Sequence, residues 1–472
     1  MQKENLLKPA KKVVVMFTIE RISEILKSTR FQLFIIPFLF YIQLITGLHS
    51  INEKSRYALI LAIVEDRSFI INKYAHLTRY IDVSLYNGNY YSDKGPGLSF
   101  LGVPLYIFGK FLVNSGFLLF EIPFYIILLS SLATSLSIVL IYDTSINIFQ
   151  ISKNASILTG LIYGFGTIAL FYSKSFFSHS FAAFLLLLSM YFGMKVTKYD
   201  ENKESNLFVS GFAMGLLALI EYFPFLTIIP LTIYLIKNKI KKELLFFLLP
   251  IIMFLGIHAI YNYVCFDNPL TPPYYYEQSE DMSVIGYYIR TTFLIGLYGQ
   301  LFSPFRGLFF YSPILLLTFH GTYKFLNKHR YETFLYLTSF VMILLLFAAQ
   351  EWWGGNCYGP RYILPVIPFV TIPIAATIED YKSNKLFWIV FSILFGLSIF
   401  NNFVGAITFS HETFLSPNPI WASLLRVLDG KIDIGLLGHR YIRIIYAAFS
   451  LFLIGQERIH NLFKSKLQTK NL

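Results

Sequence analysis

The sequence KNKIKKELLFFLLPIIMFLGIHAIYNYV, residues 237–264, carries two signals that decide the fold class. Four lysines fall within its first six residues, and after Glu243 the rest of the stretch contains no Asp, Glu, Lys or Arg. A run of about 20 apolar residues is what a helix needs to cross a hydrocarbon core about 30 Å thick. Short loops rich in Lys and Arg mark the cytoplasmic side of a membrane. The stretch therefore predicts a transmembrane helix that starts at the inner face of a membrane.

The rest of the chain repeats this apolar pattern. Its 472 residues are 55% hydrophobic and 14% charged, with a mean hydropathy of +0.57, which excludes an ordinary soluble globular protein. We predict an all-α polytopic membrane protein with about twelve transmembrane helices. Residues 1–31 and 456–472 are then cytoplasmic, and residues 32–455 form the transmembrane domain. The predicted spans fall near residues 32–49, 121–142, 156–173, 180–194, 206–220, 222–236, 244–264, 308–323, 333–350, 362–378, 386–409 and 442–455.

The charge distribution supports this topology, with the N-terminus inside. The inner segments hold 24 of the 39 Lys and Arg but 12 of the 27 Asp and Glu, so the formal net charge of +12 lies on that side. We keep the break at Glu221-Tyr-Phe-Pro224, because one kinked helix there would invert every later loop. Basic inner loops also explain the pI of 9.3 without nucleic-acid binding. We therefore predict a multi-pass protein of the cytoplasmic membrane.

The long connections lie on the outer side, at residues 50–120, 265–307, 351–361 and 410–441. Long irregular connections in a compact protein usually carry function, so we expect the active site to face outside. Within the first of them, residues 56–66 and 98–113 are expected to form interfacial helices. Between these helices, DVSLYNGNYYSDKGPGLS, residues 82–99, gathers carboxylates, a lysine and turn residues in a polar loop.

Six short motifs follow one another through the chain. They are Arg56-Tyr-Ala, Tyr91-Ser-Asp-Lys-Gly-Pro-Gly, Gly166-Thr with Ser178-His179, Phe266-Asp-Asn-Pro-Leu, Leu301-Phe-Ser-Pro-Phe-Arg-Gly-Leu and Trp352-Trp-Gly-Gly-Asn-Cys-Tyr-Gly-Pro-Arg. This series resembles the GT-C superfamily of polytopic glycosyltransferases, in particular family-39-like protein mannosyltransferases and the aminoarabinose transferases that act on lipid A. The resemblance implies a GT-C-like helical bundle that transfers a sugar from a polyprenyl-phosphate carrier to an acceptor outside the membrane. It also implies a carboxylate base in the first outer loop and basic residues that hold the lipid phosphate.

Glycosyl transfer of this kind needs at least one acid and one cation. A carboxylate that accepts the proton of an acceptor hydroxyl lowers the barrier, and Lys or Arg stabilises the charge that grows on the departing phosphate. Asp82 is the first candidate for the base. Glu53 is the second, because the aminoarabinose transferases carry a catalytic Asp-Glu pair at this position, which is Asn52-Glu53 here. The alternative for each is a solvated or Arg-paired surface carboxylate.

Three cations are candidates for ligands of the donor phosphate. Lys94 matches the lysine of the family's Lys-Pro-Pro loop, with Gly95 in place of the first proline; the alternative is that it only reaches the lipid headgroups. Arg361 follows a glycine-rich turn at the mouth of an apolar span, where it either binds phosphate or pairs with Glu351. Arg306 has the same two interpretations.

Other polar and aromatic side chains are expected to contact the substrate or to support these groups. The alternative for His179 is an interfacial histidine whose hydrogen-bonding groups are satisfied without a substrate. The alternative for Trp352 is a place in the belt of aromatic side chains at the membrane surface. The full set of supporting candidates is Asp93, Tyr91, His179, Glu221, Asp267, Glu351 and Trp352.

We expect no cofactor and no metal, although Asp82 with Asp93 could bind a divalent cation. Pairing of Cys265 with Cys357 stays open. The expected partners are a polyprenyl-phosphate sugar donor, a lipid, glycan or protein acceptor, and membrane lipid, but no nucleic acid.

The alternative function is a lipid-linked-sugar flippase or a secondary transporter. Such proteins tend to show internal repeats and charges at mid-membrane, whereas here we find no convincing repeat and the charges cluster at the outer rim.

Overall fold

The computed structural model describes residues 24, 26–116, 120–199, 202–277, 293–350, 352–408, 413, 416–433 and 435. Among these residues, helices make up nearly all of the regular structure, and one two-stranded antiparallel sheet accompanies them. The predicted all-α fold class is confirmed.

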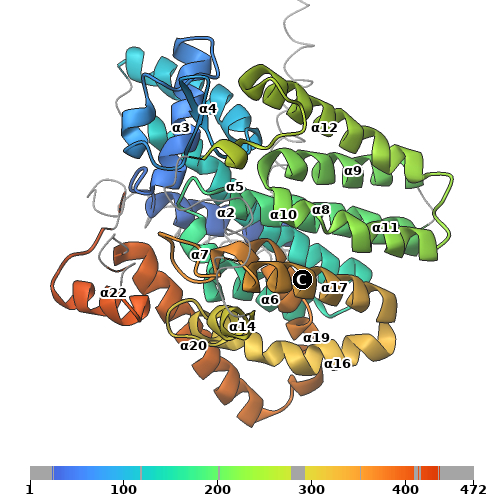
Figure 1. Cartoon of the computed structure of the whole chain (residues 1–472). Coiled ribbons are helices and arrows are strands. Elements are labelled where there is room, and N and C mark those ends of the chain that lie inside the picture. Colours follow the sequence, from blue (N-terminus) through green and yellow to red (C-terminus); the bar gives the residue numbers. More distant parts are fainter. Residues whose placement is uncertain are drawn as a thin grey trace, which may run out of the picture.

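The order of the elements along the chain can be followed in Figure 1. The first half of the chain contains α2 (Thr29–Gln43), α3 (Ile51–Glu65), η1 (Ala75–Thr78), β1 (Val83–Tyr86), β2 (Asn89–Ser92), α4 (Gly97–Asn114), α5 (Ile122–Asp143), η2 (Thr144–Ile148), α6 (Lys153–Gly166), α7 (Ala169–Tyr172), α8 (Ser178–Lys198), α9 (Lys203–Ile220), α10 (Tyr222–Phe225) and α11 (Ile228–Lys237). The second half contains α12 (Leu244–Phe266), η3 (Pro273–Tyr276), α14 (Phe293–Leu301), α15 (Leu308–Tyr311), η4 (Pro313–Leu317), α16 (Thr318–Lys328), α17 (Arg330–Ala348), η5 (Arg361–Val366), α18 (Ile367–Thr371), α19 (Ile374–Tyr381), α20 (Lys385–Thr408) and α22 (Pro419–Leu428).

The predicted number of membrane-spanning helices is not confirmed. In the described part of the chain, eight helical segments are long and apolar enough to cross a membrane, so the count of twelve is not confirmed: they are Gly97–Asn114, Ile122–Ile148, Ser178–Lys198, Lys203–Ile220, Leu244–Phe266, Arg330–Ala348, Arg361–Tyr381 and Lys385–Thr408. The first of these was expected at the interface, and its place there stays a prediction.

Two predicted spans are broken by local backbone geometry. The span at 156–173 divides at Thr167, which is extended with φ −128° and ψ 171°. The span at 308–323 divides at Ser312, with φ −135° and ψ 66°, just before Pro313. Proline has no N–H to donate and disfavours the α conformation in the residue before it. The last predicted span, at 442–455, lies outside the described residues.

The helices α8, α9 and α12 pack side by side (Figure 1). Small residues let transmembrane helices approach closely, and a Cβ atom on Gly211 of α9 would lie 2.0 Å from the carbonyl oxygen of Phe247 on α12. Helix α9 ends at Ile220, and Glu221 is extended with φ −146°. The expected break at Glu221 is therefore present, and it places this carboxylate at the end of α9.

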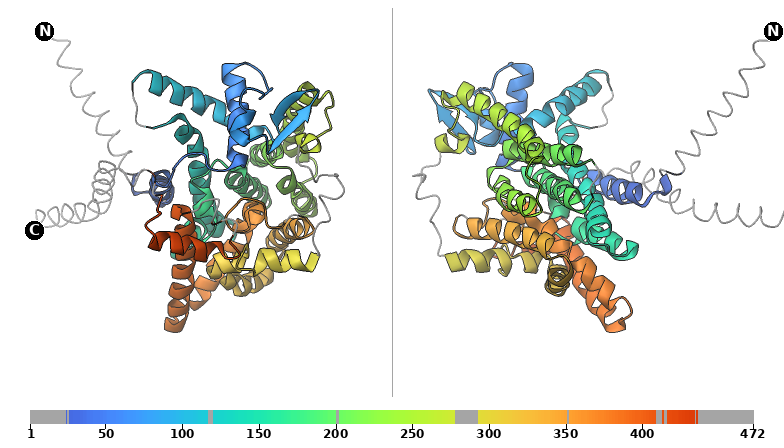
Figure 2. Two further views of the ribbon diagram at one scale, coloured as in Figure 1. Left: turned by 60° about the vertical axis from the view of Figure 1, so that its left-hand side comes forward. Right: turned by 90° about the vertical axis from the view of Figure 1, so that its right-hand side faces the viewer.

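A small second hydrophobic core joins the first outer segment to the bundle. Ala58 and Leu59 of α3 share this core with Val83 of β1 and with Cys265 and Phe266 at the end of α12. The hairpin consequently lies beside α12 (Figure 2).

The two cysteines do not pair. Cys265 and Cys357 are both buried and both free, so no disulfide joins them.

Candidate active site

A tight hairpin brings Asp82 and Asp93 together. Val83 of β1 pairs with Ser92 of β2, so the residues just outside the ladder, Asp82 and Asp93, face each other. The turn at Asn87-Gly88 has φ values of +48° and +76°, which suits the two-residue turns whose twist matches the strands. An Asn-Gly pair between alternating residues predicts such a hairpin, whereas the polar composition of residues 82–99 indicates only a loop.

The chain after Lys94 is held against the end of α9. A Cβ atom on Gly95 would lie 2.8 Å from the carbonyl oxygens of both Leu219 and Ile220. The ring of a proline at position 95 would have to enter the same space. The departure from the family's Lys-Pro-Pro loop therefore has a steric reason in this protein, and the close approach fixes Lys94 next to α9.

Replacing Gly95 with alanine is expected to destabilise the protein by about 1–3 kcal/mol, because the overpacked backbone must shift. Gly256 of α12 is a matched control, since a Cβ there would have no neighbour within 4 Å. Gly256→Ala should therefore change the stability by less than about 1 kcal/mol. Thermal unfolding of the two purified variants in detergent measures the difference. Equal melting temperatures would contradict the close approach at Gly95.

Lys94 is buried between two carboxylates. Its side chain is 6% exposed, and its Nζ atom lies 3.4 Å from Asp82 Oδ2 and in closer contact with Asp93 Oδ2. The ammonium also lies 5.1 Å from the centroid of the Tyr274 ring. Asp93 accepts a further hydrogen bond from Ser55 Oγ at 3.2 Å. Lys94 is thus held rigidly, with one carboxylate on each side.

Burial and neighbouring charges set the protonation of this group. Burial acts to lower the pKa of Lys94, but the Asp82 and Asp93 carboxylates outweigh it and hold that pKa well above its usual range. Burial is also the main cause that raises the pKa of Asp93, with Lys94 opposing it. Lys94 is therefore a cation at neutral pH. Asp82, with a side chain 23% exposed, is the more accessible of the two carboxylates.

A second charged cluster surrounds Arg56. This residue is not among the candidates that the sequence suggests for the site. The Arg56 side chain is 2% exposed, and its Nη2 donates to Ser178 Oγ at 2.6 Å and lies 3.7 Å from Glu221 Oε1. Its Nη1 donates to the backbone oxygen of Asn52 at 3.1 Å and also contacts the Asn52 side chain. One feature of the sequence could have pointed to Arg56: it is followed by eight uncharged residues on the helix α3.

Glu221 joins the end of α9 to the start of α8. Its Oε1 accepts a hydrogen bond from the Ser178 hydroxyl and lies 3.1 Å from His179 Nδ1. The other ring nitrogen, Nε2 of His179, is buried and has no hydrogen-bond partner among the described residues. The His179 ring lies 6.0 Å from that of Tyr362, centroid to centroid. His179 therefore lies between the Arg56 cluster and the segment that carries Arg361.

Arg361 is half-buried and contacts aromatic rings. Its guanidinium lies 5.5 Å from the Phe177 ring and 4.8 Å from the Tyr362 ring, and its Nη2 donates to the Tyr362 hydroxyl at 3.2 Å. Its Nε is buried without a partner, and no carboxylate of the described residues lies within 4.0 Å of the guanidinium. Glu351, the alternative partner, lies outside those residues.

Glu53 has backbone partners at both carboxylate oxygens. Its Oε2 accepts from the backbone N–H groups of His49 and Ser50 at 3.0 and 2.8 Å, which completes a capping box at the start of α3. Its Oε1 accepts from the backbone N–H of Phe176 at 2.7 Å. Glu53 is 2% exposed, so it fixes α3 against the segment that leads into α8.

Arg306 is fully buried and donates to backbone carbonyls. Its Nε and Nη1 donate to the carbonyls of Trp353 and Phe305, both at 2.9 Å. These bonds hold the glycine-rich turn that precedes Arg361. Trp352 covers α14, where a Cβ atom on Gly299 would lie 2.3 Å from its ring.

Tyr91 and Asp267 hold the hairpin against α12. The Tyr91 ring lies 5.2 Å from the Phe266 ring, and Asp267 accepts a hydrogen bond from the Tyr86 hydroxyl at 3.2 Å. These contacts are separate from the contacts of Lys94. The structure thus brings together Asp82, Asp93 and Lys94, and it joins His179 to Glu221 and Arg56.

Three carboxylates near Lys94 have the donor chemistry of a divalent-cation site. Oxygens of Asp82, Asp93 and Glu277 lie within 4.8 Å of one another, and carboxylates suit Mg²⁺ or Ca²⁺. The Lys94 ammonium, however, contacts both Asp82 and Asp93 and offsets one of their negative charges. A metal ion there would lie close to the like-charged Lys94 ammonium, which opposes its binding.

The arrangement defines an α-helical, multi-pass membrane protein with a folded segment between α3 and α4, and comparison with known proteins shows that its fold is the GT-C fold. Residues 107–261 match the family model of dolichyl-phosphate-mannose-protein mannosyltransferases. The structure superposes on apo ArnT from Cupriavidus metallidurans with a TM-score of 0.51 and 14% identity, covering 93% of this chain and 72% of that one. For ArnT from the same organism bound to undecaprenyl phosphate, the TM-score is 0.53 at 13% identity, covering 86% of this chain and 69% of that one.

These matches confirm the resemblance to the GT-C superfamily at the level of the fold. The family model covers about a third of the chain and does not include residues 82–99. No curated protein matches the sequence. The assignment of chemistry to individual residues therefore rests on the geometry of the site.

Proposed function

We propose that this protein is a glycosyltransferase that moves a sugar from a polyprenyl-phosphate carrier to an acceptor on the outer face of the cytoplasmic membrane. The observation that carries the proposal is a partly exposed carboxylate, Asp82, 3.4 Å from a buried ammonium, Lys94. The pair offers a proton acceptor and an anion-stabilising charge at one point. The GT-C fold, and the undecaprenyl phosphate bound by ArnT, support the choice of donor.

In the proposed reaction, the acceptor oxygen attacks the anomeric carbon while the bond from that carbon to the phosphate oxygen breaks. The acceptor proton passes to the Asp82 carboxylate, and the electron pair of the broken bond leaves with the polyprenyl phosphate. Lys94 stabilises the charge that grows on this phosphate. Because Asp93 holds the ammonium in place beforehand, the site needs little reorganisation during the reaction.

Asp82 suits the role of base better than Glu53 does. Both Glu53 oxygens already accept backbone N–H groups, three in all. Hydrogen bonds to a carboxylate favour its charged form and make it a weaker proton acceptor. We therefore assign Glu53 to the support of α3 and Asp82 to the chemistry.

The basic loop of the chain supports an outward-facing site. Helix α12 has 23 residues and runs from the Lys237–Lys242 loop to the hairpin. At 1.5 Å per residue it is about 35 Å long, enough to cross a hydrocarbon core. The hairpin therefore lies at the far end of α12 from a loop with the composition of a cytoplasmic one.

Arg361 is the second ligand of the donor phosphate in this proposal. Arg361→Met is expected to raise KM for the donor by roughly 10- to 100-fold, because a hydrogen bond to a charged group contributes about 1.5–3 kcal/mol. Arg79, an exposed arginine of the first outer segment, gives the control variant Arg79→Met, which should leave KM unchanged. Steady-state kinetics with a labelled polyprenyl-phosphate sugar measures both. An unchanged KM in Arg361→Met would remove Arg361 from the donor site.

In the proposed site, the Lys94 ammonium stabilises the departing phosphate, a role that a bound metal ion has in metal-dependent enzymes. Transfer by the wild-type protein is therefore expected to persist at full rate in excess EDTA, and added Mg²⁺ or Mn²⁺ should not raise it. The rate before and after chelation is the measurement. A loss of activity on chelation that Mg²⁺ or Mn²⁺ restores would show that Asp82, Asp93 and Glu277 hold a metal.

A further inference from the structure

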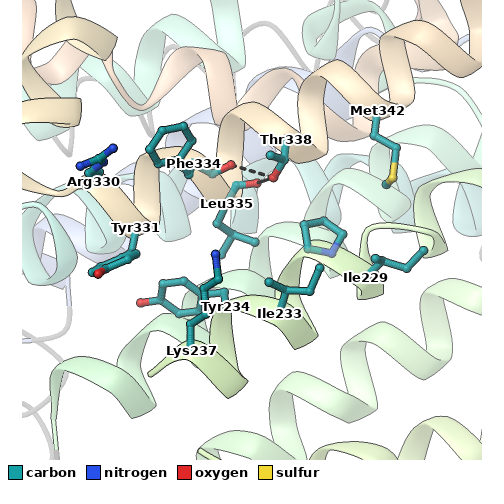
Figure 3. A pocket seen from close by; sticks show the side chains of 11 residues that line it. Ile229, Ile233, Tyr234, Lys237, Arg330, Tyr331, Phe334, Leu335, Thr338 and Met342 are labelled. Carbon is teal, nitrogen blue, oxygen red and sulfur yellow. Dashed lines mark hydrogen bonds between the residues drawn. The ribbon is translucent and has the colours of Figure 1, made fainter. Parts of the chain in front are cut away.

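A lipid-sized groove lies between α11 and α17, away from the hairpin site. Its volume is about 590 Å³, and most of its wall is apolar. Ile229 and Ile233 come from α11, and Phe334 and Met342 come from α17 (Figure 3). Ile229, Ile233 and Phe334 are about half exposed, at 54%, 49% and 46%. In a membrane, these side chains would face lipid.

Each of the two helices carries a cation toward the same end of this groove. Helix α11 ends at Lys237 and α17 begins at Arg330, so both charges flank the same end, with Ile229 and Met342 toward the other (Figure 3). Neither cation has an ion-pair partner among the described residues; the Arg330 guanidinium lies 5.6 Å from the Phe334 ring.

Glu332, the acidic residue that lies nearest to Arg330 in the sequence, does not neutralise the two cations. Glu332 is buried, where it pairs with Lys198 at 3.0 Å and accepts a hydrogen bond from the Tyr234 hydroxyl at 3.2 Å. The cationic end of the groove thus carries an uncompensated positive charge.

The length of the groove matches one leaflet of a membrane. From Arg330 to Met342, α17 advances by about 18 Å at 1.5 Å per residue. One leaflet contributes about half of a hydrocarbon core about 30 Å thick. The cations then lie at headgroup level, on the side marked as cytoplasmic by the adjacent lysine-rich loop.

We propose that this groove binds an anionic glycerophospholipid of the inner leaflet, with an acyl chain along the apolar walls and the headgroup phosphate between Lys237 and Arg330. Charge complementarity favours this occupant. The isoprenoid tail of a donor would account for the apolar walls but would leave the two cations unpaired. The lipid would close the gap between the short helix α11 and α17, on the face opposite the proposed chemistry.

Native mass spectrometry of the full chain in detergent tests this proposal, with dioleoylphosphatidylglycerol as the probe and dioleoylphosphatidylcholine as the neutral comparison. The variant Lys237→Ser/Arg330→Gln is expected to bind phosphatidylglycerol roughly 10- to 30-fold more weakly, since each cation near anionic lipid contributes about three- to fivefold. Phosphatidylcholine binding should not change. A second variant, Ile233→Trp, fills the groove without changing charge and should also weaken phosphatidylglycerol binding.

The control variant is Lys241→Ser/Lys328→Gln, which removes the same charge from exposed positions outside the groove lining. Equal losses in the two double variants would overturn the proposal, because they would show a general charge effect. No loss in Lys237→Ser/Arg330→Gln would overturn it as well. Undecaprenyl phosphate is the third probe, and a parallel loss of its binding in that variant would assign the groove to the donor tail instead. Failure of the transfer assay alone would contradict the proposed function and not this site.

Discussion

Replacing Asp82 with asparagine is expected to lower kcat for sugar transfer by about 10²- to 10⁴-fold, the usual range for loss of a general base. Asparagine keeps the size of the side chain and loses the proton-accepting charge. Asp82 has a φ of +55°, and Asn is one of the few residues that adopts this left-handed conformation readily. The fold of the hairpin should therefore survive, so that the lost activity reports on chemistry.

Asp66→Asn is the matched control for this experiment. Asp66 belongs to the same outer segment, and its carboxylate forms an exposed pair with Lys73 at 3.2 Å. Exposed pairs of this kind contribute about 0–1 kcal/mol, so the control should retain activity within about twofold. Equal activity of Asp82→Asn and Asp66→Asn would exclude Asp82 as the base and would return attention to Glu53.

Replacing Lys94 with methionine is expected to reduce transfer by about 10²- to 10³-fold, because the departing phosphate loses its principal cation. The same change leaves Asp93 buried and unpaired, which costs about 3–5 kcal/mol of folding free energy when one partner of a buried pair is removed. Activity and thermal stability therefore have to be measured together.

A double variant separates these two effects. Asp93→Asn/Lys94→Met removes both buried charges, so its melting temperature is expected to recover toward the wild-type value. Its transfer activity is expected to stay low, since no ammonium is restored. Recovery of activity with stability would show that Lys94 serves only to neutralise Asp93. Lys73→Met, which removes an exposed cation from the same segment, is the control for a general charge effect.

The sequence allowed the membrane class and the break at Glu221 to be predicted, because both depend on local hydropathy and on the charge of short loops. The number of spans was harder to predict. Thr167 and Ser312 interrupt runs that are apolar on average, and a hydropathy average does not report a change of backbone conformation.

The site was predicted in part, and the missing part depends on long-range packing. Asp82, Asp93 and Lys94 lie within 13 residues of sequence, and the Asn87-Gly88 turn would have brought them together had it been interpreted as a hairpin. The cluster joins Arg56 to Ser178, 122 positions later, and Ser178 to Glu221, a further 43 positions along the chain. In the sequence, only the run of eight uncharged residues after Arg56 pointed to this cluster.

The central claim is that this protein breaks the bond between a sugar and its polyprenyl phosphate, with Asp82 as the base. The most direct test is a proteoliposome assay that follows polyprenyl phosphate bearing a labelled sugar and separates cleaved from intact donor. The wild type is expected to release free polyprenyl phosphate and to transfer the label to an acceptor, and Asp82→Asn is expected to do neither at a comparable rate. Movement of intact donor across the bilayer without cleavage would contradict the account and indicate a flippase.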